Sequence, residues 1–391
     1  MKTLKDLNLK NKSVLLRVDI NSNVLNKKLV YNPRIKEAAS TIKLLKKLGA
    51  KITIIAHQGN KVKPDFISLK AHAKELSKFT KVKFIPDIIG KRAITEIKKL
   101  KPSESILLEN IRFHPEETTN PKTKNKLIEK LVPHFDYFIN DAFSVLHRDH
   151  TSITGFPKHL PSVVGPLVEK ELNALEKIKI KNCLYILGGS KPESNIKLLK
   201  NKNEIIAGGI FAQTCLVALG QNFGYQNEFL KSEALVKTDY KKFLKKLKSK
   251  INKKKTTFPT DFAINKNNKR HEIKINDFPS DYEIKDIGKN TIKEFKKKIK
   301  SAKAIYMKGP LGYASDKRFA KGTLEILKEI QKSKAPSIIG GGHLGEYMKK
   351  YKVDKSKFTH VSLSGGALLN YMAGEKLPGL KALGYYKNKP F

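Results

Sequence analysis

The stretch SVLLRVDINSNVLNKKLVYNPRIKEAASTIKLLKKLGAKITIIAHQG, residues 13–59, decides the fold class. It opens with a short apolar run, Ser13–Val18, and closes with another, Lys51–His57, that is rich in Ile and Thr. Between these runs, Arg34–Leu48 has apolar residues at the helical period. A strand, a helix and a second strand in this order predict a parallel β-α-β unit.

The same alternation continues along the rest of the chain. In the first half we expect further strands at Lys83–Ile85, Ser105–Leu108 and Tyr137–Asn140, and further helices at Leu69–Lys78, Thr95–Lys99 and Lys124–Leu131. In the second half we expect strands at Cys183–Leu187, Glu204–Ala207, Ala304–Met307, Ser337–Ile339 and Thr359–Val361. The pattern predicts an α/β protein with two Rossmann-like domains, each a parallel sheet with helices on both faces.

The length of 391 residues favours two domains, because single cores rarely grow beyond about 300 residues. After Gly165, a proline opens a segment with the helical period, which predicts a hinge helix over residues 165–178. We therefore expect an N-terminal domain over residues 1–164 and a C-terminal domain over residues 179–376.

The charge is strongly positive, with 79 basic against 36 acidic residues and a net charge of +43. Such a charge raises nucleic acid as a partner, since Lys and Arg neutralise phosphates. Here the lysines are spread over amphipathic helical patterns such as Lys241–Lys248, and basic and aromatic residues do not alternate. We expect solvated helix faces, so nucleic acid is an unlikely partner, but a Lys-rich nucleic-acid-binding protein stays an alternative.

The sequence favours a cytoplasmic protein. The two cysteines, Cys183 and Cys215, lie in apolar runs, which fits a reducing compartment. The first residues lack the apolar core of a signal peptide. The uncharged stretch Ile205–Asn227 contains Gly, Gln and Asn, so we interpret it as a buried strand, a glycine turn and a buried helix, with no membrane span.

Arginines gather at the predicted strand ends of the first half, where open parallel sheets bind ligands. Only seven of the 79 basic residues are Arg, and in so Lys-rich a chain an Arg is expected where its planar fork must grip carboxylate or phosphate. The residues at or beside these ends are Arg17, Arg34, Arg112, Arg148, His57, His147 and His150. They predict a site for a small, highly anionic ligand, although Arg17 lies within its strand and favours a structural role.

Glycines end the strands of the second half. The clusters are Gly188-Gly189-Ser190-Lys191, Gly208-Gly209, Gly309-Pro310-Leu311-Gly312, Gly340-Gly341-Gly342 and Ser364-Gly365-Gly366-Ala367. Glycines between a strand and a helix let backbone N–H groups approach phosphate, or open a flat slot for a nucleotide. No GxxxxGK[ST] loop occurs, and the GxGxxG at residues 340–345 lacks the acidic residue about twenty positions on, so neither a P-loop nor a dinucleotide site is predicted.

These segments together resemble phosphoglycerate kinases along nearly the whole chain. The matching strings are RVDIN (17–21), PRI (33–35), AHQG (56–59), LLENIRFHPEE (107–117), INDAFSVLHRDHTS (139–152), GGSK (188–191), GGIFAQTCL (208–216), FPTDF (258–262), DIGKNT (286–291), KGPLGY (308–313), GGGHLG (340–345) and HVSLSGGALLNYMAGEKLPGL (360–380). LLENIRFHPEE and INDAF with HR are highly specific. AHQG, GPLVEKELNAL (165–175) and the His of GGGH resemble archaeal members.

The resemblance implies reversible phosphoryl transfer between ATP and the carboxylate of 3-phosphoglycerate, giving ADP and 1,3-bisphosphoglycerate, in line and after domain closure. The N-terminal domain would bind the acid, and the C-terminal domain ATP or ADP with Mg²⁺. The tail, residues 377–391, would pack back on the first domain. We expect a monomer, with a dimer left open.

The resemblance also implies roles for individual residues. The acid site would comprise Asp19, Asn21, Arg34, His57, Arg112 and Arg148. The nucleotide site would comprise Gly188, Gly189, Lys191, Gly208, Gly209, Gly309, Pro310, Gly340, Gly341 and Gly342. Arg34 and Lys191 would be catalytic.

Several positions depart from the family pattern. They are Asn60 for an Arg (with Lys61 next), Ser194 for an Asp, Asn195 for a second Lys, Lys308 for an Asn, Ser315 for a Glu (with Asp316 next), His343 for the magnesium-linked Asp, and Leu363 and Ser364 within STGGG. All but Asn60 fall on the nucleotide side, so a non-catalytic descendant stays a second alternative. We expect no confident metal ligand and, because Asn195 replaces the second Lys, no neighbouring cation at that position that could cover the loss of Lys191.

Overall fold

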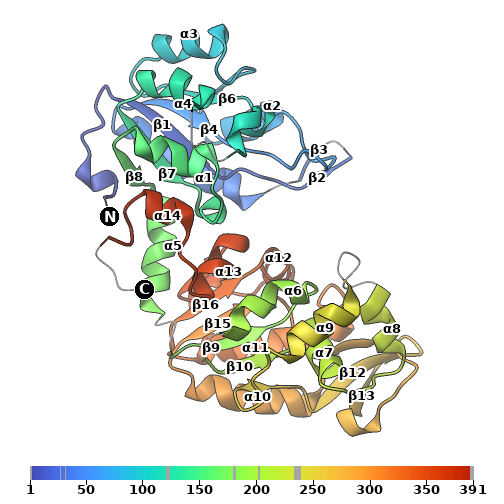
Figure 1. Ribbon diagram of the computed structural model, residues 1–391. Coiled ribbons are helices and arrows are strands. Elements are labelled where there is room, and N and C mark those ends of the chain that lie inside the picture. Colours follow the sequence, from blue (N-terminus) through green and yellow to red (C-terminus); the bar gives the residue numbers. More distant parts are fainter. Residues whose placement is uncertain are drawn as a thin grey trace. The chain divides into compact units, whose positions relative to one another are not determined.

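The fold was analysed in a computed structural model that describes residues 2–26, 28–30, 32–119, 124–178, 182–200, 203–232 and 239–387 (Figure 1). The chain divides into two compact units. Unit 1 comprises Met1–Leu172 with Lys376–Phe391, and unit 2 comprises Asn173–Glu375. No described helix has both the length and the apolar character needed to span a membrane.

Unit 1 is built on a six-stranded sheet in which every neighbouring pair is parallel, in the order β5-β6-β4-β1-β7-β8. The strands are β1 (Ser13–Val18), β4 (Lys51–Ile55), β5 (Lys83–Ile85), β6 (Ser105–Leu108), β7 (Tyr137–Asp141) and β8 (Ser162–Val164). The helices are α1 (Pro33–Lys47), α2 (Lys70–Ser77), α3 (Lys91–Lys99) and α4 (Lys126–Leu131).

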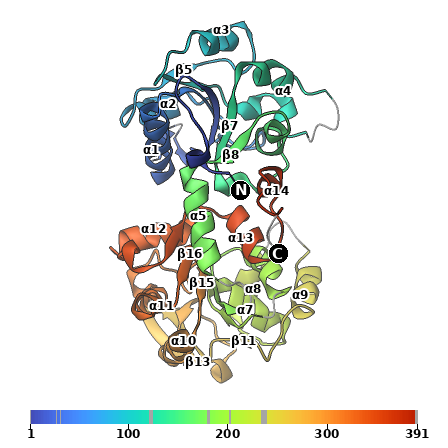
Figure 2. The same ribbon diagram turned by 90° about the vertical axis from the view of Figure 1, so that its left-hand side faces the viewer.

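The sheet of unit 1 is buried on both faces. Val14, Leu16 and Val18 of β1 belong to a core that includes residues of α1 and α2. Leu15 belongs to a second core that includes residues of α3 and α4. Because successive strand residues point to opposite faces, one helix pair covers each face, as Figure 2 shows.

Unit 2 repeats this architecture, in the order β11-β10-β9-β15-β16-β17 with parallel neighbours throughout. The strands are β9 (Leu184–Leu187), β10 (Ile205–Ala207), β11 (Thr256–Thr257), β15 (Ile305–Lys308), β16 (Ser337–Gly340) and β17 (His360–Ser362). The helices are α6 (Pro192–Asn195), α7 (Gly209–Ala218), α8 (Tyr225–Ser232), α9 (Tyr240–Lys248), α10 (Lys289–Ser301), α11 (Lys321–Lys332), α12 (Gly342–Lys350) and α13 (Gly366–Met372).

The predicted fold class is confirmed, and each predicted strand lies within two residues of an observed one. The helix predicted at Thr95–Lys99 begins four residues earlier, at Lys91, and its first turn already buries Ala93 in the core. The stretch after Ile205 forms β10 and then the buried helix α7, as interpreted.

Part of unit 2 was not predicted. An antiparallel sheet, β13-β12-β14, comprises β12 (Asp261–Lys266), β13 (Lys269–Lys274) and β14 (Ile284–Ile287). The sequence of β13, KRHEIK, is mostly charged and exposed, so it has no apolar alternation. A small hairpin of β2 (Val24–Leu25) and β3 (Lys28–Leu29) was likewise not predicted.

The chain passes between the units in α5 (Pro166–Lys177), and the division between Leu172 and Asn173 lies inside this helix. The later helix α14 (Pro378–Ala382) belongs to unit 1. There the Gly379 N–H donates to the carbonyl of Leu146 at 2.9 Å, and a Cβ atom on Gly379 would lie 2.6 Å from a methyl carbon of Leu146. The domain limits expected from the sequence, residues 1–164, 165–178 and 179–376, stay a prediction.

Candidate active site

In unit 1, arginines from separate strand ends lower the pKa of one histidine, His57. We call Asp19, Arg34, His57, Arg112 and Arg148 the basic site. Burial, followed by the charges of Arg17, Arg112, Arg148 and Arg34, holds the pKa of His57 well below its usual value of 6.5. The fold therefore brings together residues that follow or open β1, α1, β4, β6 and β7, as parallel strands with aligned carboxyl ends require.

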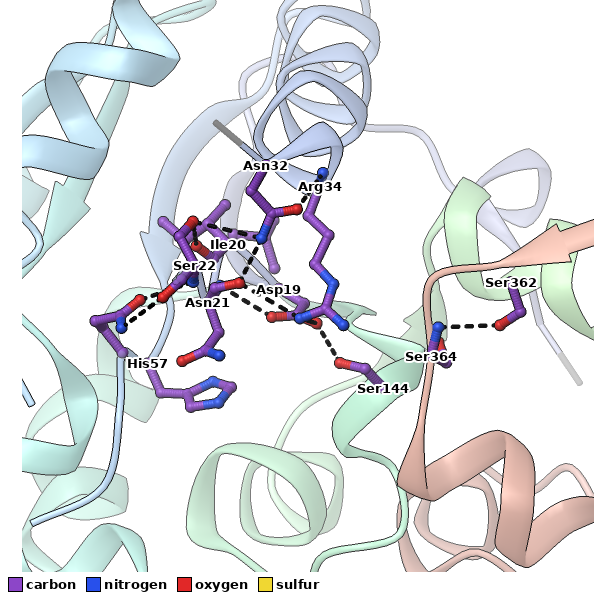
Figure 3. Close-up of polar contacts among 12 residues, drawn as sticks. Asp19, Ile20, Asn21, Ser22, Asn32, Arg34, His57, Ser144, Ser362 and Ser364 are labelled. Carbon is purple, nitrogen blue, oxygen red and sulfur yellow. Dashed lines mark hydrogen bonds and ion pairs between the residues drawn. The ribbon is translucent and has the colours of Figure 1, made fainter. Parts of the chain in front are cut away.

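Asp19 orients the Arg34 side chain at the start of α1. Arg34 Nη1 lies 3.1 Å from Asp19 Oδ2, and the Ser144 hydroxyl donates to the same carboxylate oxygen (Figure 3). The Asn21 N–H donates to Asp19 Oδ1 at 3.1 Å. Ser144 was not predicted as a site residue, although it lies in the quoted INDAFSVLHRDHTS segment.

Asn21 forms hydrogen bonds to the turn after β4 and to the residue before α1. Its side-chain oxygen accepts from the Gly59 N–H at 2.9 Å, and its carbonyl accepts from Asn32 Nδ2 at 2.6 Å. Gly59 has φ +68°, and a Cβ atom there would lie 2.3 Å from the carbonyl oxygen of Asp65, so only glycine fits this turn. The Gly59 carbonyl in turn accepts a hydrogen bond from Arg112.

Arg112 has buried side-chain hydrogen-bond donors that are not used within the described part of the chain. Its side chain is 7% exposed, and its Nε and Nη2 atoms have no hydrogen-bond partner among the described residues. Burial and the neighbouring Arg148 and Arg17 lower its pKa to about 10. Arg148 is half-buried; burial lowers its pKa, and the charges of Asp19 and Glu117 oppose this. A buried guanidinium with unused donors, beside a second one, suits an anion that brings its own acceptors.

A buried network lies behind the basic site. Arg17 is 1% exposed; its Nε donates to Ser152 Oγ at 3.0 Å, and its Nη2 lies 3.0 Å from His57 Nδ1. Ser152 Oγ donates to Glu117 Oε1 at 2.6 Å. Burial raises the pKa of Glu117, and the Arg17 charge opposes that rise. This geometry agrees with the structural role favoured for Arg17, and neither Glu117 nor Ser152 was anticipated.

The two further histidines differ. His150 lies 3.7 Å from Glu117 Oε1, and burial with the charges of Arg148 and Arg112 lowers its pKa to about 4. His147 is half-buried, and Asn60 and Lys61 are exposed.

In unit 2, the glycine turns line a pocket of about 420 Å³, which we call the glycine pocket. It is lined by Gly188, Gly189, Ser190, Lys191, Ser194, Lys308, Gly309, Pro310, Gly341, Gly342, His343, Leu344, Gly365, Gly366 and Leu369. The turns after β9 and β15 touch: a Cβ atom on Gly188 would lie 2.2 Å from the Pro310 carbonyl oxygen, and the Gly189 N–H donates to that oxygen at 2.7 Å.

A second pocket of about 480 Å³ shares Gly189, Ser190, Pro310 and His343 with the glycine pocket. Its other lining residues are Gly209, Ile210, Gln213, Phe229, Glu283, Ile284, Lys285, Gly312, Tyr313 and Tyr347. Lys285 and Glu283 form an ion pair at 3.0 Å, and Lys285 Nζ lies 4.7 Å from the Tyr313 ring centre. Most of these residues were not predicted as site residues. Glu283 precedes β14 and Lys285 lies in it, and this strand belongs to the antiparallel sheet that was not predicted.

Two predicted nucleotide-site glycines, Gly208 and Gly340, do not line either pocket. A Cβ atom on Gly208 would lie 2.5 Å from the Leu311 side chain, and one on Gly340 2.8 Å from that of Leu368. Their glycine identity is explained by close packing between strand ends and neighbouring elements.

The sequence and the fold of the chain match a known family. The model for "Phosphoglycerate kinase" matches residues 4–375. The phosphoglycerate kinases of Methanothermus fervidus and Methanopyrus kandleri are 39% and 36% identical, each over 97% of this chain and 96% and 97% of their own. The crystal structure of phosphoglycerate kinase from Pyrococcus horikoshii OT3 has a TM-score of 0.88 at 35% identity, over 98% of both chains.

The chain belongs to the phosphoglycerate kinase family. These relatives are archaeal, as the resemblance indicated, and phosphoglycerate kinases are phosphotransferases that use ATP or ADP. Nothing in the comparisons supports a nucleic-acid-binding protein or a non-catalytic descendant.

One of the departures from the family pattern has a cationic neighbour that the sequence did not indicate. Lys308 Nζ donates to Asn195 Oδ1 at 2.5 Å and to Ser194 Oγ at 2.7 Å. Positions 195 and 308 are distant in sequence, and the adjacency of β9 and β15 brings them together.

The other departures from the phosphoglycerate kinase pattern are scattered. His343 is exposed and lines both pockets, Ser315 is exposed outside them, and Leu363 is half-buried. The buried Ser364 donates its N–H to Ser362 Oγ at 3.0 Å (Figure 3). No Asp or Glu lines the glycine pocket, and the described residues contain no group of three or more His, Cys, Asp or Glu side chains that could hold a metal. These residues do not fit a resident metal ion.

Proposed function

We propose that the chain catalyses phosphoryl transfer between ATP and 3-phosphoglycerate, with the acid in the basic site and the nucleotide in the two pockets of unit 2. The observation that carries the acid site is Arg112, a buried guanidinium with two donors that lack partners among the described residues. Arg148 and Arg34 add charge at the same place, and neutral His57 adds a hydrogen-bond donor. Such a set suits a ligand that carries both phosphate and carboxylate.

The nucleotide assignment rests on the glycine pocket. Backbone N–H groups of glycine turns can approach a phosphate chain closely, and Lys191 brings a mobile charge to its rim. The second pocket offers Phe229 and Ile210 as apolar surface and Tyr313 as an aromatic ring, which suit a base. Mg²⁺ would enter as part of the nucleotide substrate, holding few protein ligands and several waters.

The mechanism requires no general base, because the attacking carboxylate is already ionised at neutral pH. The protein must hold the acid and the nucleotide in line and stabilise the charge on the transferring group. We assign this stabilisation to Arg34, held by Asp19, and to Lys191. Since the two ligands belong to different units, catalysis needs closure, which also excludes water and suppresses ATP hydrolysis.

We further propose a cytoplasmic monomer. Cys183 and Cys215 are free and buried, which fits a reducing compartment. Sedimentation of the purified chain should give a single species near its 44.2 kDa mass. A stable dimer would contradict this part of the proposal.

A coupled assay with 3-phosphoglycerate and MgATP tests the function. We expect ADP formation that depends on both substrates, and no ADP when glycerate, which lacks the phosphate, replaces 3-phosphoglycerate. Replacing ATP by GTP in the same assay gives the nucleotide preference. Absence of turnover by a folded protein with both substrates would overturn the proposed function.

A further inference from the structure

The ammonium group of Lys308 lies in the wall of the glycine pocket. Lys308 is the last residue of β15, directly before Gly309 and Pro310. Ile305 and Met307 of this strand belong to the core cluster that includes residues of α10 and α11, so Tyr306 and Lys308 point to the opposite face. At the strand end, that orientation brings the Lys308 side chain to the pocket.

The contacts of Lys308 are all with neutral groups. Its Nζ atom donates to Ser194 Oγ and Asn195 Oδ1, and it forms no ion pair with any described residue. Both acceptors are themselves fixed: Ser194 Oγ donates to the Lys191 carbonyl at 2.8 Å, and Asn195 Nδ2 donates to the Gly188 carbonyl at 3.1 Å. An ammonium has three N–H donors, so one donor is left for another partner.

The electrostatic setting of Lys308 is unfavourable without a ligand. Burial and the like charge of Lys191 lower its pKa to about 8. A hydrogen bond between β15 and α6 alone could be made by a neutral side chain, without the cost of burying a charge. The presence of a charged Lys308 is explained if an anion binds its remaining N–H donor and compensates its charge.

We propose that Lys308 is a second phosphate-binding cation of the nucleotide site, held in place by the positioning residues Ser194 and Asn195. The proposal rests on the proposed function in taking the glycine pocket as the nucleotide site. It also explains two departures together. Relative to the family pattern, Lys and Asn have exchanged places between positions 195 and 308, and the exchanged side chains touch. The charge is retained and is carried by a strand end in place of a helix.

Binding of ATP and of adenosine to purified variants tests the proposal. Lys308→Met removes the charge but keeps the length of the side chain, and Lys200→Met, at an exposed position of unit 2 outside both pockets, is the matched control. By titration calorimetry, Lys308→Met should weaken ATP binding about 10-fold or more, as loss of a charge-assisted hydrogen bond predicts. Adenosine binding should not change, because adenosine carries no phosphate. Lys200→Met should change neither.

The exchange variant Asn195→Lys/Lys308→Asn adds a rescue. It should bind ATP within a few-fold of the original chain, whereas Lys308→Asn alone should not. In the original chain, raising the pH from 7 to 9 should weaken ATP binding more than in Lys308→Met. The other titratable groups lining the pocket are Lys191 and His343, and the original chain and Lys308→Met both contain them.

Two outcomes would overturn the proposal: unchanged ATP affinity in Lys308→Met, or equal loss of ATP and adenosine affinity, which would indicate a merely structural role. These measurements use nucleotide alone. A failure of the proposed function, in which the original chain does not convert 3-phosphoglycerate, is therefore seen separately from a failure of this proposal.

Discussion

The Nη2 atom of Arg17 lies 3.0 Å from the Nδ1 atom of His57, and both side chains are buried. An arginine can only donate, so Nδ1 accepts and the proton of the neutral imidazole is on Nε2. A histidine among four arginines thus serves as an uncharged donor. In the proposed function, this donor would give the basic site a hydrogen bond to its ligand without a further positive charge that repels the neighbouring arginines.

Neutral His57 makes stability depend on pH. Its pKa in the folded chain is lowered, so the unfolded chain binds the extra proton, and stability is present above pH 6.5 and is lost as the pH falls. Between pH 7.5 and 5.5 this group should cost about 1.4 kcal/mol. Urea unfolding at both pH values should show a smaller loss in His57→Gln than in the original chain. An identical pH dependence would show that the pKa of His57 is the same in the folded and unfolded chains.

Arg112→Lys should weaken 3-phosphoglycerate binding by about 1–3 kcal/mol, because a point charge cannot reproduce the planar fork. Arg148→Lys should have a similar effect. The control is Arg92→Lys, at an exposed position on α3, which should leave affinity unchanged. Titration calorimetry distinguishes these outcomes, and full affinity in Arg112→Lys would remove this residue from the site.

Arg17 should matter for stability more than for binding. Arg17→Met leaves the carboxylate of Glu117, which is fully buried, without the positive charge that lowers its pKa most, and should lower the free energy of unfolding by about 3–5 kcal/mol. Adding Glu117→Gln should recover part of that loss, because the uncompensated charge is gone. Denaturant melts of the single and double variants measure the recovery. Additive losses would mean that the two residues do not interact.

Lys191→Ala should lower kcat about 10²-fold and change nucleotide affinity little, if Lys191 contacts the transferring group mainly in the transition state. The presence of Lys308 leads us to expect a different pattern in Lys308→Met, in which ATP binding itself is weakened. Steady-state kinetics of the two variants separate these roles. A kcat within a few-fold of the original in Lys191→Ala would exclude it from the mechanism.

Residues at strand ends could be predicted because their positions follow from the local sequence. Arg112 and Gly188 each follow a short apolar run, and parallel topology then places every such end on one edge of its sheet. The scarcity of Arg beside Lys supplied a further signal, since four of the seven arginines lie in or behind the basic site.

The residues that were missed depend on tertiary contacts. Glu117 lies in a polar string and gives no local sign of being fully buried; its burial depends on Ser152, in a different segment. Lys308 was taken only as a replaced Asn, because its partner Asn195 lies in another segment of unit 2. The second pocket depends on β14, whose partner strand β12 also pairs with the charged strand β13.

The return of α14 to unit 1 bears on how the chain is synthesised. Unit 2 is one continuous segment, whereas unit 1 is completed only after Lys376–Phe391 has been synthesised, behind all of unit 2. The amide of Gly379, which donates to Leu146, therefore reaches its place only after unit 2 has been synthesised. A nascent chain stalled before residue 376 would carry unit 1 still short of α14 and unit 2 with its full sequence.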